Sequence, residues 1–199
     1  MAIEFQYNKT SLQALEKQLK VRQRALPTLK NKESALRLEV KKAKIRAEEL
    51  DNDLEQQMAS YDMMAKLWCE FDSDLVAIKD VHLTRMKLAG VVTPHLEKIE
   101  FEVREFSLFT SPVWISDGIE MVKRLATVAI EREVFIEKMH LLEHARKKTT
   151  QKVNLYEKVQ IPGYQEAVLK IKRFMEDEEN LSKAAQKIVK TKKEREESV

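Results

Sequence analysis

The sequence predicts a mainly α-helical protein, a long antiparallel two-helix coiled coil with a short β-hairpin or loop head in the middle of the chain. Three observations lead to this fold class. Apolar residues recur at alternating steps of three and four in both halves of the chain, the pattern of a coiled-coil seam. Charged residues make up 35% of the 199 residues, against three glycines and four prolines, a balance typical of long helices. An alternating pattern occurs only in the middle. We therefore expect a first helix within residues 1–72, a head within 73–117 and a second helix within 118–199, together one elongated domain.

The first helix is predicted by a ladder of 17 positions, of which 14 are apolar. Three polar residues, Arg22, Glu33 and Gln57, interrupt it. Eight heptads without a glycine predict one helix of roughly 60 residues. The apolar positions are Leu12, Leu15, Leu19, Leu26, Leu29, Leu36, Val40, Ala43, Ala47, Leu50, Leu54, Tyr61, Met64 and Trp68.

The ends of this helix and its proline follow from local signals. Asn8 or Thr10 can cap the start, and the helix is expected to continue to about Asp72. Pro27 removes a hydrogen bond in mid-helix, yet the ladder passes through it without a break. We therefore expect a kink at Pro27 rather than a helix end.

Charge is unevenly distributed along the first helix. Between Lys17 and Arg46 eleven basic residues face two acidic ones, whereas between Glu48 and Asp80 ten acidic residues face two lysines. Such a division suits two partners at two heights. A solvated charged face on a long helix explains it equally well.

The head is expected to be a small β-hairpin. Ile99, Phe101 and Val103 alternate with charged residues, which is the period of a strand. Phe106, Phe109 and Trp114 then form an apolar loop, able to pack under the helices or to dock on a neighbour.

Asp117 is expected to open the second long helix, whose ladder changes phase after the sequence Ile161-Pro162-Gly163. If the helices fold back with Trp68 near Glu120, Pro27 falls level with Pro162. We therefore expect both helices to bend at Pro27 and Pro162, at the same height. This pairing leaves roughly the last 20 residues as a single-helix tip.

Motifs for chemistry are nearly absent. The three glycines are too far apart to form a phosphate loop, and Cys69 is the only cysteine. The sequence His140-Leu141-Leu142-Glu143-His144 matches the HxxEH pattern of a zinc peptidase, but flanking surface histidines are the favoured interpretation. We expect no cofactor, no nucleic-acid binding and no membrane insertion, since the longest uncharged run is too short to span a bilayer.

Several segments resemble the D subunit of the V-type (archaeal/vacuolar-type) rotary ATPases and ATP synthases. The first is Asn8-Lys9-Thr10 followed by Leu26-Pro27-Thr28-Leu29-Lys30-Asn31-Lys32-Glu33-Ser34-Ala35-Leu36. The others are Ala89-Gly90-Val91-Val92-Thr93-Pro94-His95-Leu96, Val153-Asn154-Leu155-Tyr156-Glu157-Lys158-Val159-Gln160-Ile161-Pro162, Glu178-Glu179-Asn180 and Lys187-Ile188-Val189-Lys190. The resemblance covers almost the whole chain, in order.

The resemblance implies a non-catalytic central-stalk rotor subunit, cytoplasmic and peripheral to the membrane, which couples ion transport to ATP synthesis or hydrolysis. The paired termini would insert into the ring of catalytic and nucleotide-binding subunits. The small F subunit of the stalk would bind the side, and a funnel-shaped subunit would link the foot to the membrane rotor ring.

Two sets of residues are hypothesised to bind these partners. Phe106, Phe109 and Trp114 would lie at the foot of the stalk. Basic residues of the first helix would face acidic loops of the catalytic ring: Arg37, Lys41, Lys42, Lys44 and Arg46. The alternatives are a generic coiled-coil scaffold or tether, which would favour a symmetric homodimer, and the zinc peptidase.

Overall fold

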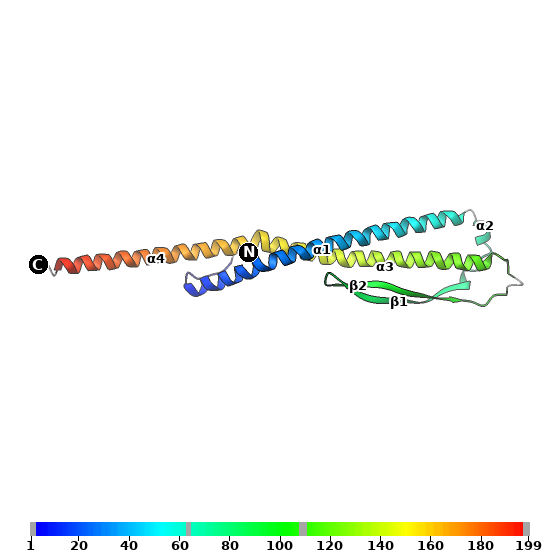
Figure 1. Ribbon diagram of the computed structural model, residues 1–199, viewed down its shortest axis with the longest axis horizontal. Helices are drawn as coiled ribbons and strands as arrows, with labels where there is room; N and C mark the ends of the chain where they lie inside the picture. The colour runs from blue at the N-terminus through cyan, green and yellow to red at the C-terminus, as the bar shows by residue number, and fades with distance from the viewer. Residues whose placement is uncertain (1–2, 63–64, 108–110, 197–199) are drawn as a thin grey trace. The chain divides into compact units, whose positions relative to one another are not determined.

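The computed structural model describes residues 3–62, 65–107 and 111–196, so that Met64 and Phe109 lie outside the described residues. Its helices are α1 (Lys9–Asp62), α2 (Ala65–Trp68), the short 3-10 turn η1 (Ser73–Leu75), α3 (Ile115–Asn154), the π-helical segment η2 (Leu155–Gln160) and α4 (Ile161–Glu196). Strands β1 (Val76–Leu88) and β2 (Val91–Val103) form an antiparallel hairpin in the middle of the chain (Figure 1). The predicted fold class is confirmed.

Contacts divide the chain into two compact units, which are described separately. Unit 1 contains residues 1–31 and 149–199, and unit 2 contains residues 32–148. Each unit therefore takes one part of α1 and pairs it with a later helix.

The first helix starts as predicted and ends earlier than predicted. The Asn8 side chain accepts a hydrogen bond from the backbone N–H of Ser11 at 2.7 Å, so Asn8 is the residue that caps α1. Helical structure ends at Trp68, four residues before the expected end at Asp72. The reason is local, because the Asp72 side chain accepts a hydrogen bond from the backbone N–H of Asp74 and so caps η1 instead.

The second helix begins slightly before the expected position. The structure starts α3 at Ile115, which places Asp117 inside the first turn. A carboxylate there interacts favourably with the helix dipole. The backbone N–H of Gly118 already donates to the carbonyl of Trp114 at 2.8 Å.

The hairpin is longer than the alternation at Ile99–Val103 indicated, since each strand has 13 residues. Ala89 and Gly90 form the two-residue turn, and both have positive φ, 48° and 82°. Positive φ at both central positions is the geometry that matches the twist of the two strands. The register shifts between Ile78 and Asp80 and between His82 and Leu83.

In unit 2, α3 is covered on two sides. Figure 1 shows the hairpin running along α3, with the unit 2 part of α1 on another side of the same helix. Between Met121 and Ile136 only Arg124 and Glu133 are exposed. Leu36, Ala43 and Leu142 form the core near the hairpin turn, and Leu75, Ile115 and Ile119 form a second core at the base.

In unit 1, the N-terminal part of α1 pairs antiparallel with the end of the chain. Glu16 contacts Lys172, and Lys30 contacts Glu157 further back in the sequence. Leu15 packs in a core with Ala167, Val168 and Ile171, and the segment before α1 closes this core with Ile3 and Phe5.

A π-helical segment accounts for the phase change in the second ladder. The predicted change after Ile161-Pro162-Gly163 lies directly beyond η2, and a π turn holds one residue more than an α turn. Pro27 is inside α1, and Pro162 is the second residue of α4. Side chains on either side of Pro27, Arg22 and Lys30, contact Gln160 and Glu157. The bend at these prolines stays a prediction.

Candidate interaction surfaces

The seam of α1 is filled by the chain itself. Each described ladder position from Leu12 to Trp68 is buried or half-buried, including the interrupting residues Arg22, Glu33 and Gln57. The partner residues come from η2 and α4 in unit 1 and from α3 in unit 2. A second copy of the chain would have to displace these contacts to use the same seam.

The predicted basic residues separate into two groups on α1. Arg37, Lys41 and Lys44 are spaced by four and three, so they share one helix face, and all three are exposed. Arg37 pairs with Glu33 at 3.0 Å and Lys44 with Glu48 at 3.6 Å. Within the described residues Lys41 makes no recorded ion pair. Exposed pairs of this kind are weak, so this row stays available for an acidic partner.

Lys42 and Arg46 form the other group. Lys42 pairs with Glu39 at 2.8 Å. Arg46 donates to Glu49 at 3.3 Å on its own helix and to Glu131 of α3 at 3.2 Å. The hydrogen bonds to Glu49 and Glu131 raise the pKa of Arg46. Arg46 therefore ties α1 to α3, and a partner would compete with this contact.

Phe106 and Trp114, proposed for the foot, are half-buried and pack against other parts of unit 2. Both lie against the core of Leu75, Ile115 and Ile119. The Trp114 ring meets Trp68 edge-on, with centroids 5.6 Å apart. This loop was expected either to pack under the helices or to dock on a neighbour, and Phe106 and Trp114 do the first. The neighbouring Val113 is 96% exposed, and Phe109 lies outside the described residues.

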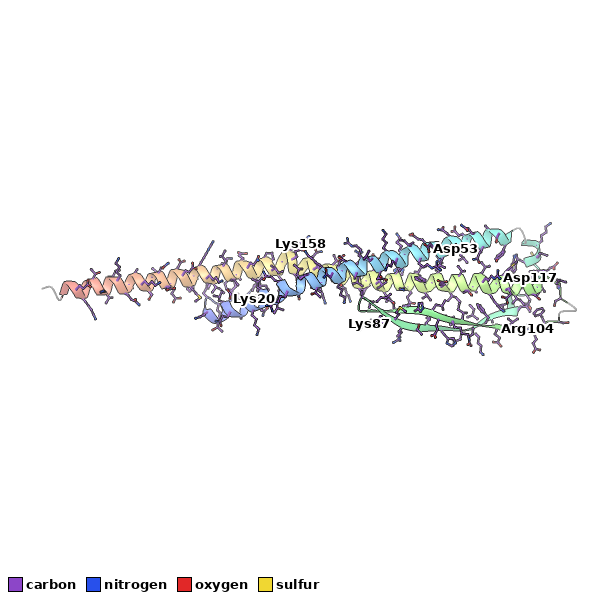
Figure 2. The ribbon with its side chains drawn as sticks, in the orientation of Figure 1. Lys20, Asp53, Lys87, Arg104, Asp117 and Lys158 are labelled. Carbon is purple, nitrogen blue, oxygen red and sulfur yellow. The ribbon has the colours of Figure 1, made fainter. Side chains whose placement is uncertain are left out.

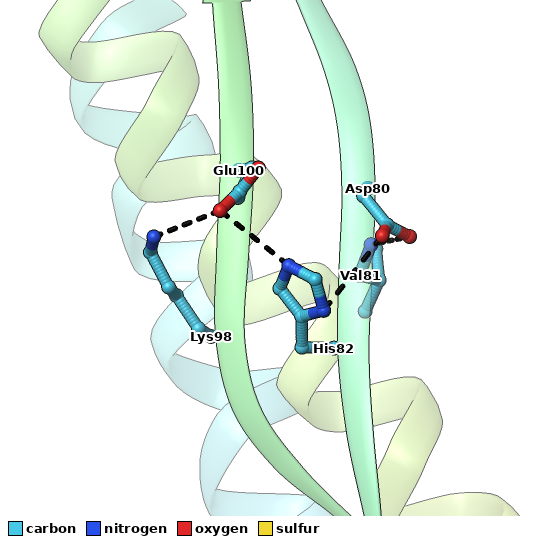
Figure 3. Close-up of polar contacts among 5 residues, drawn as sticks. All are labelled: Asp80, Val81, His82, Lys98 and Glu100. Atoms are coloured by element: carbon cyan, nitrogen blue, oxygen red, sulfur yellow. Dashed lines mark hydrogen bonds and ion pairs between the residues drawn. The ribbon is translucent and has the colours of Figure 1, made fainter.

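A charged cluster lies on the hairpin (Figure 3). Lys98 donates to Glu100 at 2.8 Å, and His82 lies between Glu100 at 3.4 Å and Asp80 at 3.7 Å. The hydrogen bond from Lys98 is the main cause that lowers the pKa of Glu100. The cluster lies between the two register shifts of the hairpin.

A groove of about 370 Å³ separates β2 from α3 in unit 2. It is lined by Pro94–Ile99 and Phe101 on the hairpin and, on α3, by Thr127, Glu131, Val134, Phe135 and Lys138. Lys87 and Arg104 mark the two ends of the hairpin along α3 (Figure 2). Sequence patterns gave no signal for this groove, because its walls are more than 25 residues apart.

The C-terminal part of α4 is uncovered. From Glu176 to Glu194 each side chain is exposed. Three large apolar side chains in this stretch are more than half exposed: Leu181 at 73%, Ile188 at 59% and Val189 at 55%. The stretch corresponds to the predicted single-helix tip.

The HxxEH residues have a different environment from that of a metal site. His140 and His144 are exposed, and Glu143 pairs with Arg146 at 3.5 Å and Lys147 at 3.6 Å. Across residues 3–62, 65–107 and 111–196, no three His, Cys, Asp or Glu side chains are grouped to hold a metal ion. In the same described ranges, no helix has a sufficiently long apolar stretch to cross a bilayer.

Three features are typical of a structural component of a larger assembly. They are a helix pair whose seam is packed by the chain itself, an exposed row of basic residues, and a helix end that nothing in the described residues covers. Comparison with known proteins gives this class a family. The family model for the D subunit of ATP synthase matches residues 11–191, so the chain belongs to the ATP synthase D-subunit family. It is a non-catalytic component of a V-type ATP synthase complex.

Similar proteins agree over nearly the whole chain. The V-type ATP synthase D subunit of Borreliella burgdorferi is 29% identical over 189 residues, which cover 92% of each protein. The D subunit of Chlamydia muridarum is 30% identical over 188 residues, covering 89% of this chain and 90% of the relative. That of Chlamydia pneumoniae is 28% identical over 182 residues, covering 89% of this chain and 87% of the relative.

Proposed function

We propose that this chain is the central-stalk rotor subunit, which transmits torque between the membrane ion-translocating ring and the catalytic ring. It thereby couples ion transport to ATP synthesis or hydrolysis, and it works on the cytoplasmic side, peripheral to the membrane. Family membership supports the setting. The observation that carries the proposal is the uncovered end of α4, with Leu181, Ile188 and Val189 exposed.

Helices in proteins are stabilised mainly by packing of an apolar face, and the exposed apolar side chains of Glu176–Glu194 favour burial against another protein. The resemblance to rotary ATPases points to the ring of catalytic and nucleotide-binding subunits as the cover. The exposed row Arg37, Lys41 and Lys44 supports a second contact, with acidic loops of that ring. We further propose that the small F subunit binds the side of the helix pair and that the funnel-shaped subunit binds the foot.

A photo-crosslinking amino acid in place of Leu181 tests the contact of the α4 end. In the assembled complex we expect covalent products with the ring subunits and a loss of ATP hydrolysis, because a crosslinked rotor cannot turn. The same probe in place of Lys79 on the hairpin is the control. Products with ring subunits that leave hydrolysis unchanged would contradict rotation.

Charge reversal tests the basic row. Replacing Arg37, Lys41 and Lys44 by Glu is expected to lower ion transport per ATP hydrolysed while the complex still assembles. The matched control is the replacement of Lys79, Arg85 and Lys87 by Glu, which makes the same change of charge at exposed positions of β1. Equal coupling in both variants would reject a specific role for the row.

The scaffold alternative predicts a homodimer. The filled seam favours a monomer of the isolated chain, and light scattering at several concentrations separates the two. Metal analysis of the purified protein tests the zinc peptidase.

A further inference from the structure

An arginine lies on the apolar seam of α1. Arg22 occupies a ladder position between Leu19 and Leu26, and its side chain is half-buried. A guanidinium keeps its charge at any physiological pH. Covering it among apolar side chains costs free energy unless its donors are hydrogen-bonded.

Contacts from both helices hold this guanidinium. Its Nε donates to Oε1 of Gln160 at 2.7 Å, and its Nη1 donates to Oε1 of Gln18 at 3.0 Å and to the Gln18 carbonyl at 3.2 Å. The Tyr164 ring lies against the guanidinium, with the centroid 4.4 Å from Cζ. The Tyr164 hydroxyl donates to Oε1 of Gln18 at 3.0 Å. Gln18, Arg22, Gln160 and Tyr164 thus form a connected polar layer across unit 1, with Gln18 at its exposed edge.

Two residues of this layer come from the end of η2 and the first residues of α4. Tyr156, Gln160, Tyr164 and Val168 follow one another at steps of four, and all are buried or half-buried. In a continuous α-helix each four-residue step turns about 40° past the stripe, and the wider turn of η2 reduces this drift between Tyr156 and Gln160. Gln160 and Tyr164 are four residues apart, so they share one helix face, and both reach Arg22. Single π turns are uncommon and occur often at functional sites.

We propose that this polar layer fixes the longitudinal register of the helix pair in unit 1, with Arg22 as the positioning residue. If the later helix slid along α1 by one heptad in one direction, Ala167 and Ile171 would replace Gln160 and Tyr164 opposite Arg22. Neither of these side chains can accept a hydrogen bond. A slide in the other direction would place Val153 and Glu157 opposite Arg22, and Glu157 would lose its ion pair with Lys30. A polar residue on a seam specifies register at a cost in stability.

The mechanical use of this register rests on the proposed function. A pair of helices under torque transmits it only if one helix does not slip along the other. The register itself is a property of the isolated chain, so its test does not depend on rotation.

Spin-label distance measurement on the full chain tests the proposal. Labels at Thr28→Cys and Glu178→Cys, in a Cys69→Ala background, lie on different helices and well apart along them. The parent is expected to give one distance. Arg22→Leu is expected to add a second distance shifted by up to about 10 Å, one heptad at 1.5 Å per residue, with a Tm equal to or above that of the parent.

Two further variants make the result decisive. Gln160→Met removes the hydrogen-bond acceptor of Arg22 with little change in size, and it should also produce the second distance. It keeps the proposal testable in case Arg22→Leu does not fold. Arg24→Leu removes the same charge from an exposed site two residues away and should keep one distance. A single unchanged distance in Arg22→Leu and Gln160→Met would overturn the proposal. So would a second distance in Arg24→Leu.

Discussion

Leu36 of α1 and Leu142 of α3 lie in one core cluster, and both side chains are 0% exposed. Leu88, Ala89 and Val91, at and beside the hairpin turn, pack against this cluster. Three elements that are distant in sequence therefore depend on these two leucines for their packing in unit 2.

We expect Leu142→Ala to lower the free energy of unfolding by about 2–5 kcal/mol, since it removes fully buried methyl groups and leaves a cavity. Denaturant unfolding followed by circular dichroism measures the loss. Leu141→Ala is the matched control, because Leu141 is 39% exposed. Equal losses in both variants would contradict the packing.

Gly118 allows two aromatic rings to pack against α3. A Cβ at this position would lie 2.8 Å from Cζ3 of Trp114 and 3.2 Å from Cε2 of Phe71. Gly118→Ala should therefore destabilise unit 2 by about 1–3 kcal/mol, although alanine favours helix more than glycine does. Thermal unfolding and the near-ultraviolet signal of the tryptophans report the change. A gain in stability, as propensity alone predicts, would contradict this packing.

Substitutions at the two residues of the hairpin turn should change stability in different directions. Gly90 has φ +82°, and a Cβ there would lie 3.3 Å from Nζ of Lys32. We expect Gly90→Ala to cost about 1 kcal/mol, because side chains are unfavourable at positive φ. Ala89→Gly, at the other positive φ, should be neutral or slightly stabilising. Reversal of this order in thermal unfolding would show that the turn has another conformation.

The Glu16–Lys172 pair should make unit 1 sensitive to acid. The hydrogen bond from Lys172, at 2.7 Å, is the main cause that lowers the pKa of Glu16. A carboxylate with a lowered pKa in the folded state stabilises the fold above its unfolded pKa, and this contribution is lost as the pH falls through the folded pKa. Glu16→Gln should therefore lose about 0.2–1 kcal/mol near neutral pH and match the parent in acid.

Glu176→Gln is the control for this pair, because Glu176 is an exposed glutamate of α4 for which the described residues provide no recorded ion pair. Unfolding is measured from neutral pH into the acidic range. A Glu16→Gln difference that persists unchanged in acid would exclude the ion pair as its cause.

The seam and the strand alternation were predictable because each depends on spacing within one segment. Every described seam position is covered, and Ile99 and Phe101 lie in β2. The sequence also indicated the phase change near Pro162, but not the π-helical form that absorbs it. Several conformations can take up one additional residue, and spacing does not choose among them.

The polar layer and the foot could not be predicted in the same way. In the sequence, Arg22 is recognisable only as a polar interruption of the ladder. Its partners Gln160 and Tyr164 are more than 130 residues further along the chain, so spacing does not reveal them. Phe106 and Trp114 could equally pack or dock, and the choice depends on Phe71, Leu75 and Ile119. Whether Arg37, Lys41, Lys42, Lys44 and Arg46 bind the ring stays a prediction.

Rotation of this chain within the complex tests the central claim most directly. The complex is fixed to a surface through its catalytic ring, and a bead is attached at Arg85→Cys on the exposed β1 strand, in the Cys69→Ala background. On addition of ATP we expect the bead to turn continuously in one direction, at a rate that follows hydrolysis. A bead that stays still while the same complexes hydrolyse ATP would contradict the rotor function.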